Sequence, residues 1–116
     1  EARGFLFASA LADRLKCGLI PVRKAGKLPG EVLTKKYDLE YGSAQLEIRK
    51  DCVPSEARVL IVDDVLATGG TAVCAANLFH EMEANIVGFA FLASLSFLKG
   101  EEKLHAYRTV SLVKYE

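Results

Sequence analysis

Apolar side chains recur along this chain with two different periods, and the period predicts where helices and strands lie. Near-helical spacing predicts a helix over residues 5–16, a second over residues 71–84 and a short one over residues 97–104. Continuous apolar runs predict buried strands over residues 19–22, 58–62, 86–93 and 109–113. Strand, helix and strand therefore alternate at short spacing, which is typical of a parallel sheet with helices on its faces.

The segment between the first two predicted strands has a different composition. Residues 23–36 contain Gly26, Pro29, Gly30 and five Lys or Arg side chains, so we expect a basic, mobile loop. Alternating apolar positions over residues 37–48 predict an antiparallel strand that follows a turn at Tyr41 and Gly42. The expected fold is thus one α/β domain over residues 1–116, with a Rossmann-like parallel sheet and a flexible loop or antiparallel ribbon.

Composition narrows the functional classes. The chain has 116 residues, with 15 Lys and Arg balanced by 15 Asp and Glu, so it lacks the basic footprint of a general nucleic-acid binder. No apolar stretch reaches the length of about 18 residues that a membrane helix needs. The three cysteines form no C-x-x-C pair, which favours a reduced, cytoplasmic setting.

The segment most informative about chemistry is residues 59–71, VLIVDDVLATGGT. An apolar strand leads into Asp63 and Asp64, and ligands of open α/β sheets bind beyond the carboxyl ends of strands. A small, glycine-containing turn follows and opens a helix, whose free N–H groups and dipole favour a phosphate. Two carboxylates beside a phosphate site could accept hydrogen bonds from sugar hydroxyls. Together these features indicate a phosphorylated sugar as ligand.

Competing motifs fail on inspection of the sequence. Neither G-x-x-x-x-G-K-[ST] nor G-x-G-x-x-G occurs. His80 and Glu81 begin a zincin-like pattern, but Ala84 stands where the second histidine would be, so His80 is interpreted as an exposed helix residue. A signalling receiver domain needs a further aspartate on a later strand, and no aspartate follows Asp64.

Residues 59–71 resemble the phosphoribosyl pyrophosphate (PRPP) signature of type I phosphoribosyltransferases over their full length. The rest of the chain is similar to the adenine-specific branch of that family, at residues 1–5, 22–30, 39–42, 46–48, 96–100 and 111–116. The resemblance implies the type I phosphoribosyltransferase fold and a Mg²⁺-dependent reaction in which adenine and PRPP give AMP and pyrophosphate. It also implies a homodimer.

The resemblance further implies a role for individual residues. The 5′-phosphate would be bound by Ala67, Thr68, Gly69, Gly70 and Thr71, and the ribose hydroxyls by Asp63 and Asp64. Glu40 and Arg3 are the implied catalytic residues, with Tyr41 beside Glu40 in the flexible loop, and no side chain is expected to bind Mg²⁺ directly, because PRPP carries it. The pyrophosphate would be held by Ala2, Arg3, Arg23, Lys24 and Lys27.

The same resemblance shows what to expect outside the chain. The sequence begins at Glu1 rather than Met, and we expect it to lack the family's N-terminal strand and the hood that covers adenine. The preference for adenine consequently rests on the family and not on a base-reading residue. Two alternatives stay open: a regulatory module that binds PRPP without catalysis, and a transferase for another purine. The lid residues are present and no basic helix is appended, which favours the enzyme.

Overall fold

The computed structural model describes residues 2–39 and 41–116. Its centre is a three-stranded parallel sheet in the order β4-β5-β6, formed by β4 (Arg58–Leu66), β5 (Asn85–Leu95) and β6 (Thr109–Tyr115). Helix α2 (Gly70–Glu81) connects β4 to β5, whereas η1 (Ser96–Leu98) and α3 (Gly100–Lys103) lie between β5 and β6. The predicted α/β fold with a helix-flanked parallel sheet is therefore confirmed.

A second sheet is an antiparallel ribbon. Strands β2 (Val32–Asp38) and β3 (Ser43–Arg49) pair along their whole length, from Val32 opposite Arg49 to Asp38 opposite Ser43. The short strand β1 (Arg23–Lys24) pairs with the other edge of β3. At the tip, the Leu39 N–H donates to the Gly42 carbonyl at 3.0 Å, which closes the turn that the sequence predicted.

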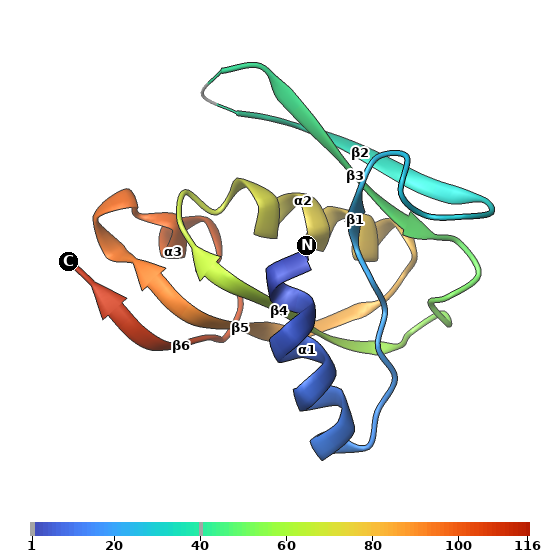
Figure 1. The fold of residues 1–116 in the computed structure, drawn as a ribbon, viewed down its shortest axis with the longest axis horizontal. Helices are drawn as coiled ribbons and strands as arrows, with labels where there is room; N and C mark the ends of the chain where they lie inside the picture. The colour runs from blue at the N-terminus through green and yellow to red at the C-terminus, as the bar shows by residue number, and fades with distance from the viewer. Residues whose placement is uncertain (1, 40) are drawn as a thin grey trace.

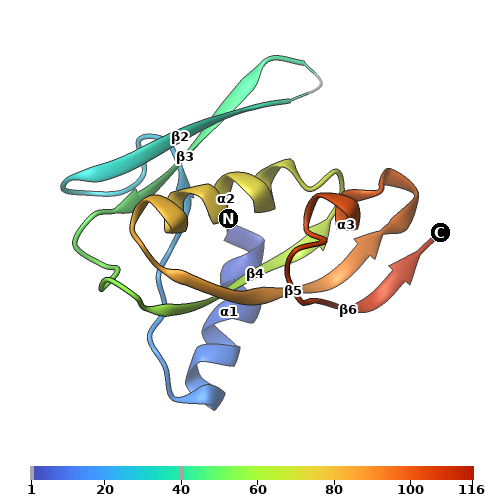
Figure 2. The same ribbon diagram turned by 180° about the vertical axis from the view of Figure 1, so that it is seen from behind.

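Helix α2 lies between the two sheets, while α1 (Ala2–Leu15) lies on the other face of the parallel sheet (Figure 1). The ribbon runs along α2, and its tip extends toward the same end of the molecule as the turn after β4 (Figures 1 and 2). The core is formed by apolar side chains of the parallel sheet, α2 and β3. No helix in the part of the chain that the structure describes is long and apolar enough to cross a membrane.

Two local predictions were wrong. Residues 19–22 form no strand, because no strand within residues 2–39 and 41–116 pairs with them to complete their backbone hydrogen bonds. Residues 23–36 are not one loop, because β1 and the first part of β2 lie within them and pair with β3. The adjacent Lys35 and Lys36 lie on opposite faces of β2: Lys36 is exposed, whereas Lys35 is half-buried and forms an ion pair with Glu81 of α2. A basic composition is therefore compatible with a paired strand.

Most other boundaries moved by a few residues. Helix α1 begins at Ala2 rather than at residue 5, and α2 ends at Glu81 rather than at residue 84. The predicted short helix is divided into η1 and α3, separated by Lys99 in a left-handed conformation. Strand β4 continues to Leu66, so the two aspartates lie within the strand and not after it. Their carboxylates are therefore more enclosed than the sequence indicated.

Phe89 gives a test of this core. It is 1% exposed in β5, and its ring packs 5.3 Å from the Tyr107 ring and 6.3 Å from the Phe91 ring, centre to centre. Phe89→Ala should lower the free energy of unfolding by about 3–5 kcal/mol, because it leaves a cavity in the sheet. Leu112→Ala, at a position that is 74% exposed, should change it by less than about 0.5 kcal/mol. Urea denaturation of both variants measures the difference, and equal losses would contradict the assigned core.

Candidate active site

A cleft of about 350 Å³ opens at the carboxyl end of β4. Its wall combines the end of β4, the turn of residues 67–69 and the first turn of α2, with Arg3 from α1 and Phe91 from β5 at its margins. Three separate parts of the chain thus meet at one point. The structure brings eight of the predicted site residues into this cleft: Arg3, Asp63, Asp64, Ala67, Thr68, Gly69, Gly70 and Thr71.

The start of α2 is arranged to receive an anion. Gly69 is the N-cap residue, in a left-handed conformation with φ of 90°, and no side chain caps the helix. The first backbone N–H groups of a helix have no partner within the helix, and the helix dipole places partial positive charge beside them. These donors lie at the cleft, together with the Thr68 and Thr71 side chains. This turn is therefore suited to bind a phosphate group.

We call residues 67–71, at the start of α2, the phosphate turn. It packs against Gly100, a residue whose role the sequence analysis missed. A Cβ atom on Gly100 would lie 2.3 Å from the Ala67 carbonyl oxygen and 3.1 Å from the Gly69 nitrogen. In turn, a Cβ atom on Gly69 would lie 3.0 Å from the Gly100 carbonyl oxygen. The two backbones therefore approach each other at a distance that only glycine permits. The Lys-Gly pair at the start of α3 was the available signal, but the contact of Gly100 with the turn depends on the tertiary fold.

The two aspartates differ in their surroundings. The Asp64 carboxylate forms an ion pair with Arg3, with 2.8 Å between Arg3 Nε and Asp64 Oδ2, and its Oδ1 accepts a hydrogen bond from the Val65 N–H at 2.8 Å. Asp63 Oδ1 accepts a hydrogen bond from the Asp64 N–H at 2.8 Å. Burial raises the pKa of Asp63 above its usual range, and the neighbouring Asp64 carboxylate acts in the same direction.

Arg3 links the first helix to this acidic pair. Its side chain is 81% exposed although its guanidinium contacts Asp64, whose side chain is 13% exposed. An exposed arginine can bind an anionic ligand at the mouth of the cleft while one edge of its guanidinium stays on the carboxylate. This arrangement places a cation next to the position where an anionic leaving group would depart from a sugar held by the aspartates.

The remaining predicted site residues lie outside the cleft. Arg23 and Lys24 form β1, and the Arg23 guanidinium lies 5.7 Å from the centre of the Phe5 ring. Lys27 follows in an exposed turn. Ala2 is exposed at the start of α1, and Tyr41 is 88% exposed at the tip of the ribbon. Glu1 and the catalytic candidate Glu40 lie outside the described residues.

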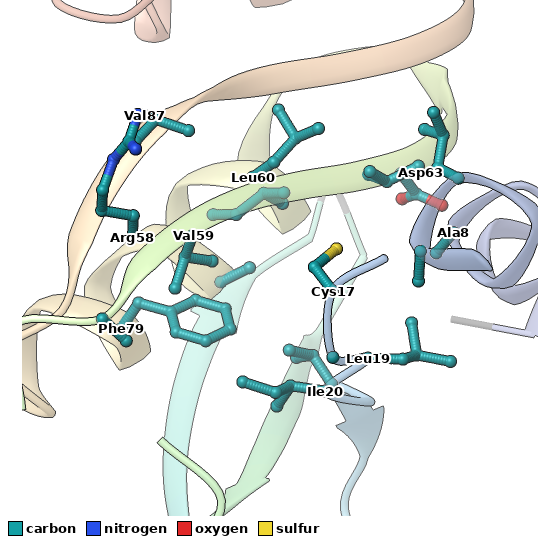
Figure 3. Close-up of a pocket in the computed structure, with 18 of the residues that line it drawn as sticks. Ala8, Cys17, Leu19, Ile20, Arg58, Val59, Leu60, Asp63, Phe79 and Val87 are labelled. Atoms are coloured by element: carbon teal, nitrogen blue, oxygen red, sulfur yellow. The ribbon is translucent and has the colours of Figure 1, made fainter. Parts of the chain in front are cut away.

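A larger cavity, of about 660 Å³, lies beside β4 (Figure 3). Val59 and Leu60 of β4 line one side, and Cys17, Leu19 and Ile20 of the extended segment after α1 line the other. Among the described residues, β4 pairs with β5 on one edge only, and this cavity runs along its other edge. Its lining is mainly apolar, and Arg58, Asp63 and Thr71 also border it. Asp63 and Thr71 are shared with the smaller cleft, where most of the polar site residues gather.

The geometry of the cleft defines a class of protein. Carboxylates stand beside an uncapped helix start at the end of a parallel strand, which is an arrangement for a sugar phosphate. The family model that describes the phosphoribosyl transferase domain matches residues 1–115. The chain therefore belongs to the phosphoribosyltransferase family.

Individual relatives are adenine phosphoribosyltransferases. The enzyme of Trichodesmium erythraeum is 50% identical over 115 residues, which are 99% of this chain and 68% of that protein. The crystal structure of the Thermoanaerobacter pseudethanolicus enzyme has a TM-score of 0.96 at 51% identity, covering 99% of this chain and 67% of the other. The Saccharomyces cerevisiae enzyme, complexed with an imino-altritol bisphosphate and adenine, has a TM-score of 0.92 at 48% identity, covering 97% and 63%. This chain thus spans about two thirds of their length.

Gly100 provides a test of the support behind the phosphate turn. Gly100→Ala should displace the turn of residues 67–69, because the new methyl group would collide with the Ala67 carbonyl. We expect the dissociation constant for ribose 5-phosphate, measured by calorimetry, to rise by about tenfold or more, equivalent to the loss of one or two hydrogen bonds to the charged phosphate. Gly18→Ala is the matched control, since a Cβ atom there meets nothing within 4 Å. Unchanged binding by Gly100→Ala would contradict the assigned support.

The raised pKa of Asp63 predicts a conflict between stability and binding. The folded state favours the protonated carboxyl, so the cost of ionising Asp63 is absent below its unfolded pKa of about 3.9 and develops as pH rises through the higher folded pKa. Asp63→Asn carries no charge and retains an oxygen that can accept the Asp64 N–H. We expect this variant to be more stable than the wild type at pH 7 and to lose that advantage in acid.

Two measurements test Asp63→Asn against the wild type. Urea denaturation at several pH values gives the free energy of unfolding, and calorimetry at pH 7 gives the affinity for ribose 5-phosphate. Binding should weaken because a charged acceptor for the sugar hydroxyls is lost. A variant that is less stable than the wild type at neutral pH would show that ionised Asp63 stabilises the fold.

Proposed function

We propose that this chain is the catalytic core of an adenine phosphoribosyltransferase, which converts adenine and PRPP into AMP and pyrophosphate in purine salvage. The observation that carries the proposal is the cleft in which Asp63 and Asp64 lie beside the uncapped start of α2. A phosphate at the turn of residues 67–71 would place the ribose next to the two carboxylates. The adenine phosphoribosyltransferases that are about 50% identical to the chain support adenine as the base.

The proposed reaction exchanges one bond at the anomeric carbon of the ribose. A nitrogen of adenine forms the new bond to C1′, and the bond from C1′ to the pyrophosphate oxygen breaks, so that pyrophosphate departs with the electron pair. Arg3 would stabilise the charge that develops on the leaving group, with help from Arg23, Lys24 and Lys27. Glu40 would act as the acid/base at the imidazole edge of adenine and take up the proton that adenine loses when the new bond forms. Asp63 and Asp64 would orient the ribose through its 2′- and 3′-hydroxyls.

Magnesium is proposed as the cofactor, carried into the site by PRPP. The phosphate oxygens of PRPP are ligands of the kind that Mg²⁺ prefers, so the ion would be bound through PRPP. The Asp63 and Asp64 carboxylates at the cleft fit this arrangement, because their negative charge would favour the cation without binding it directly. When bound, the ion would neutralise negative charge on the departing pyrophosphate.

We also propose that the chain is the core of a longer enzyme, in which a further strand lies beside β4 and a hood covers the adenine. Its span of about two thirds of the relatives supports this proposal. So does the 660 Å³ cavity, which separates the unpaired edge of β4 from the extended residues 17–22. A homodimer and a cytoplasmic location complete the proposal. The exposed apolar side chains of Leu6 and Leu15 on α1 support association, and three free thiols fit a reducing compartment.

Assay of the enzyme that contains this chain tests the reaction. With Mg²⁺ and PRPP, adenine should give AMP, while hypoxanthine and guanine assayed in parallel should give little product. Glu40→Ala should lower kcat by about 10²- to 10⁴-fold, the contribution typical of general acid–base catalysis. Glu116→Ala, which removes an exposed carboxylate at the end of β6, should leave kcat unchanged.

Other outcomes of this assay would identify the alternatives. Turnover of another purine alone would preserve the fold and the site but reject adenine as the substrate. Binding of PRPP without turnover of any base would identify a regulatory module.

A further inference from the structure

Tyr37 connects the ribbon to the phosphate turn, although neither the motif nor the proposed reaction assigns it a role. It lies in β2, two residues before the turn at the ribbon tip begins. Its hydroxyl lies 3.2 Å from Thr71 Oγ1, in the first turn of α2. Its ring is half-buried against the core and lies beside Gly70, since a Cβ atom on Gly70 would lie 3.8 Å from Tyr37 Cδ2.

The other polar contacts between β2 and α2 lie farther along the helix. Cys74 Sγ donates to the Lys35 carbonyl oxygen at 3.5 Å, and the Lys35 ammonium forms an ion pair with Glu81, the last residue of α2. These two contacts hold the ribbon to the helix away from the cleft. The contact between Tyr37 and Thr71 is the one at the phosphate end, near the tip of the ribbon.

The chemistry of the two hydroxyls makes this contact sensitive to a bound phosphate. A threonine hydroxyl has one proton to donate and lone pairs with which to accept. A phosphate oxygen without a proton can only accept a hydrogen bond, so the Thr71 hydroxyl must donate its hydrogen bond to the phosphate. Tyr37 must then donate to Thr71 Oγ1. Without phosphate, either hydroxyl can be the donor. Phosphate therefore selects one direction of the bond, and hydrogen bonds in such a chain strengthen one another.

We propose that Tyr37 is a positioning residue through which the 5′-phosphate of PRPP holds the ribbon against the first turn of α2, beside the cleft. The inference rests on the proposed function, because it requires Thr71 to bind that phosphate. Tyr37 itself does not touch the substrate. When a phosphate binds at the phosphate turn, Tyr37 would stabilise β2. Through β2 it would also stabilise the ribbon tip, which belongs to the proposed catalytic loop. Only a ligand with a terminal phosphate would strengthen this contact.

Hydrogen exchange of backbone amides, with and without saturating PRPP and Mg²⁺, tests this link. In the wild type, PRPP should slow exchange both in the segment of residues 67–72 and in β2. The effect on β2 should reach at most about fivefold, the factor of one net hydrogen bond, because phosphate strengthens a bond that is already present. Tyr37→Phe keeps the ring and removes the hydroxyl. It should retain protection of residues 67–72 but lose most of the protection of β2. Tyr115→Phe, an exposed tyrosine on β6, is the matched control and should behave as the wild type.

The results separate this link from the proposed function. Absence of PRPP protection at residues 67–72 in the wild type would reject the proposed function, and the link with it. Protection of residues 67–72 without protection of β2, or equal protection of β2 in Tyr37→Phe, would overturn the link alone. Before PRPP is added, β2 should already exchange faster in Tyr37→Phe than in the wild type, because the bond to Thr71 is present without ligand. The change that PRPP causes in each protein is therefore the quantity that tests the link. If Tyr37→Phe does not fold, Thr71→Val removes the same bond from the other side and should likewise lose protection in β2 at PRPP saturation.

Discussion

Packing of helix α2 between two sheets is the constraint on which the rest of the structure depends. Small side chains on its buried surface let the parallel sheet approach from one side and the ribbon from the other: Ala72, Cys74, Ala75 and Ala76. Leu78 and Phe79 fill the space that remains. Because both sheets hold the helix, its first turn is fixed relative to the end of β4 and relative to the ribbon. The phosphate turn needs this rigidity, since uncapped N–H groups bind an anion well only when they are already oriented.

Placing two carboxylates inside β4 works against stability and in favour of the site. A strand that ended before Asp63 would leave both side chains in solvent, where their charges would be well hydrated. The continuation of β4 to Leu66 instead encloses them, and the pKa of Asp63 rises because its charged form is poorly solvated. Arg3 offsets part of this cost at Asp64. Acceptors in such a partly dry position hold a sugar hydroxyl more strongly than acceptors exposed to water.

The sequence predicted the parts of this molecule that are local. Residues 59–71 identify a strand, a turn and a helix in one continuous segment, and the structure places their side chains around one cleft. The elements it mispredicted depend on distant partners. Strand β2 is rich in lysine and becomes a strand only by pairing with β3, whereas residues 19–22 are apolar enough for a strand and lack a neighbour. The close approach of Gly100 to Gly69 joins segments about thirty residues apart, which no local pattern reveals.

In the proposed function, the ribbon would connect the basic residues that lie outside the cleft to the phosphate turn. The Glu47 carboxylate, buried in β3, accepts a hydrogen bond from the Gly26 N–H at 2.9 Å and one from the Thr34 hydroxyl at 3.5 Å. It thereby ties the turn that follows β1 to both long strands of the ribbon. Lys24 and Lys27 therefore share one hydrogen-bonded framework with the ribbon tip. That framework contacts the phosphate turn through Tyr37. In the proposed function, the 5′-phosphate and the pyrophosphate of PRPP would therefore both be bound by residues that are connected through the ribbon.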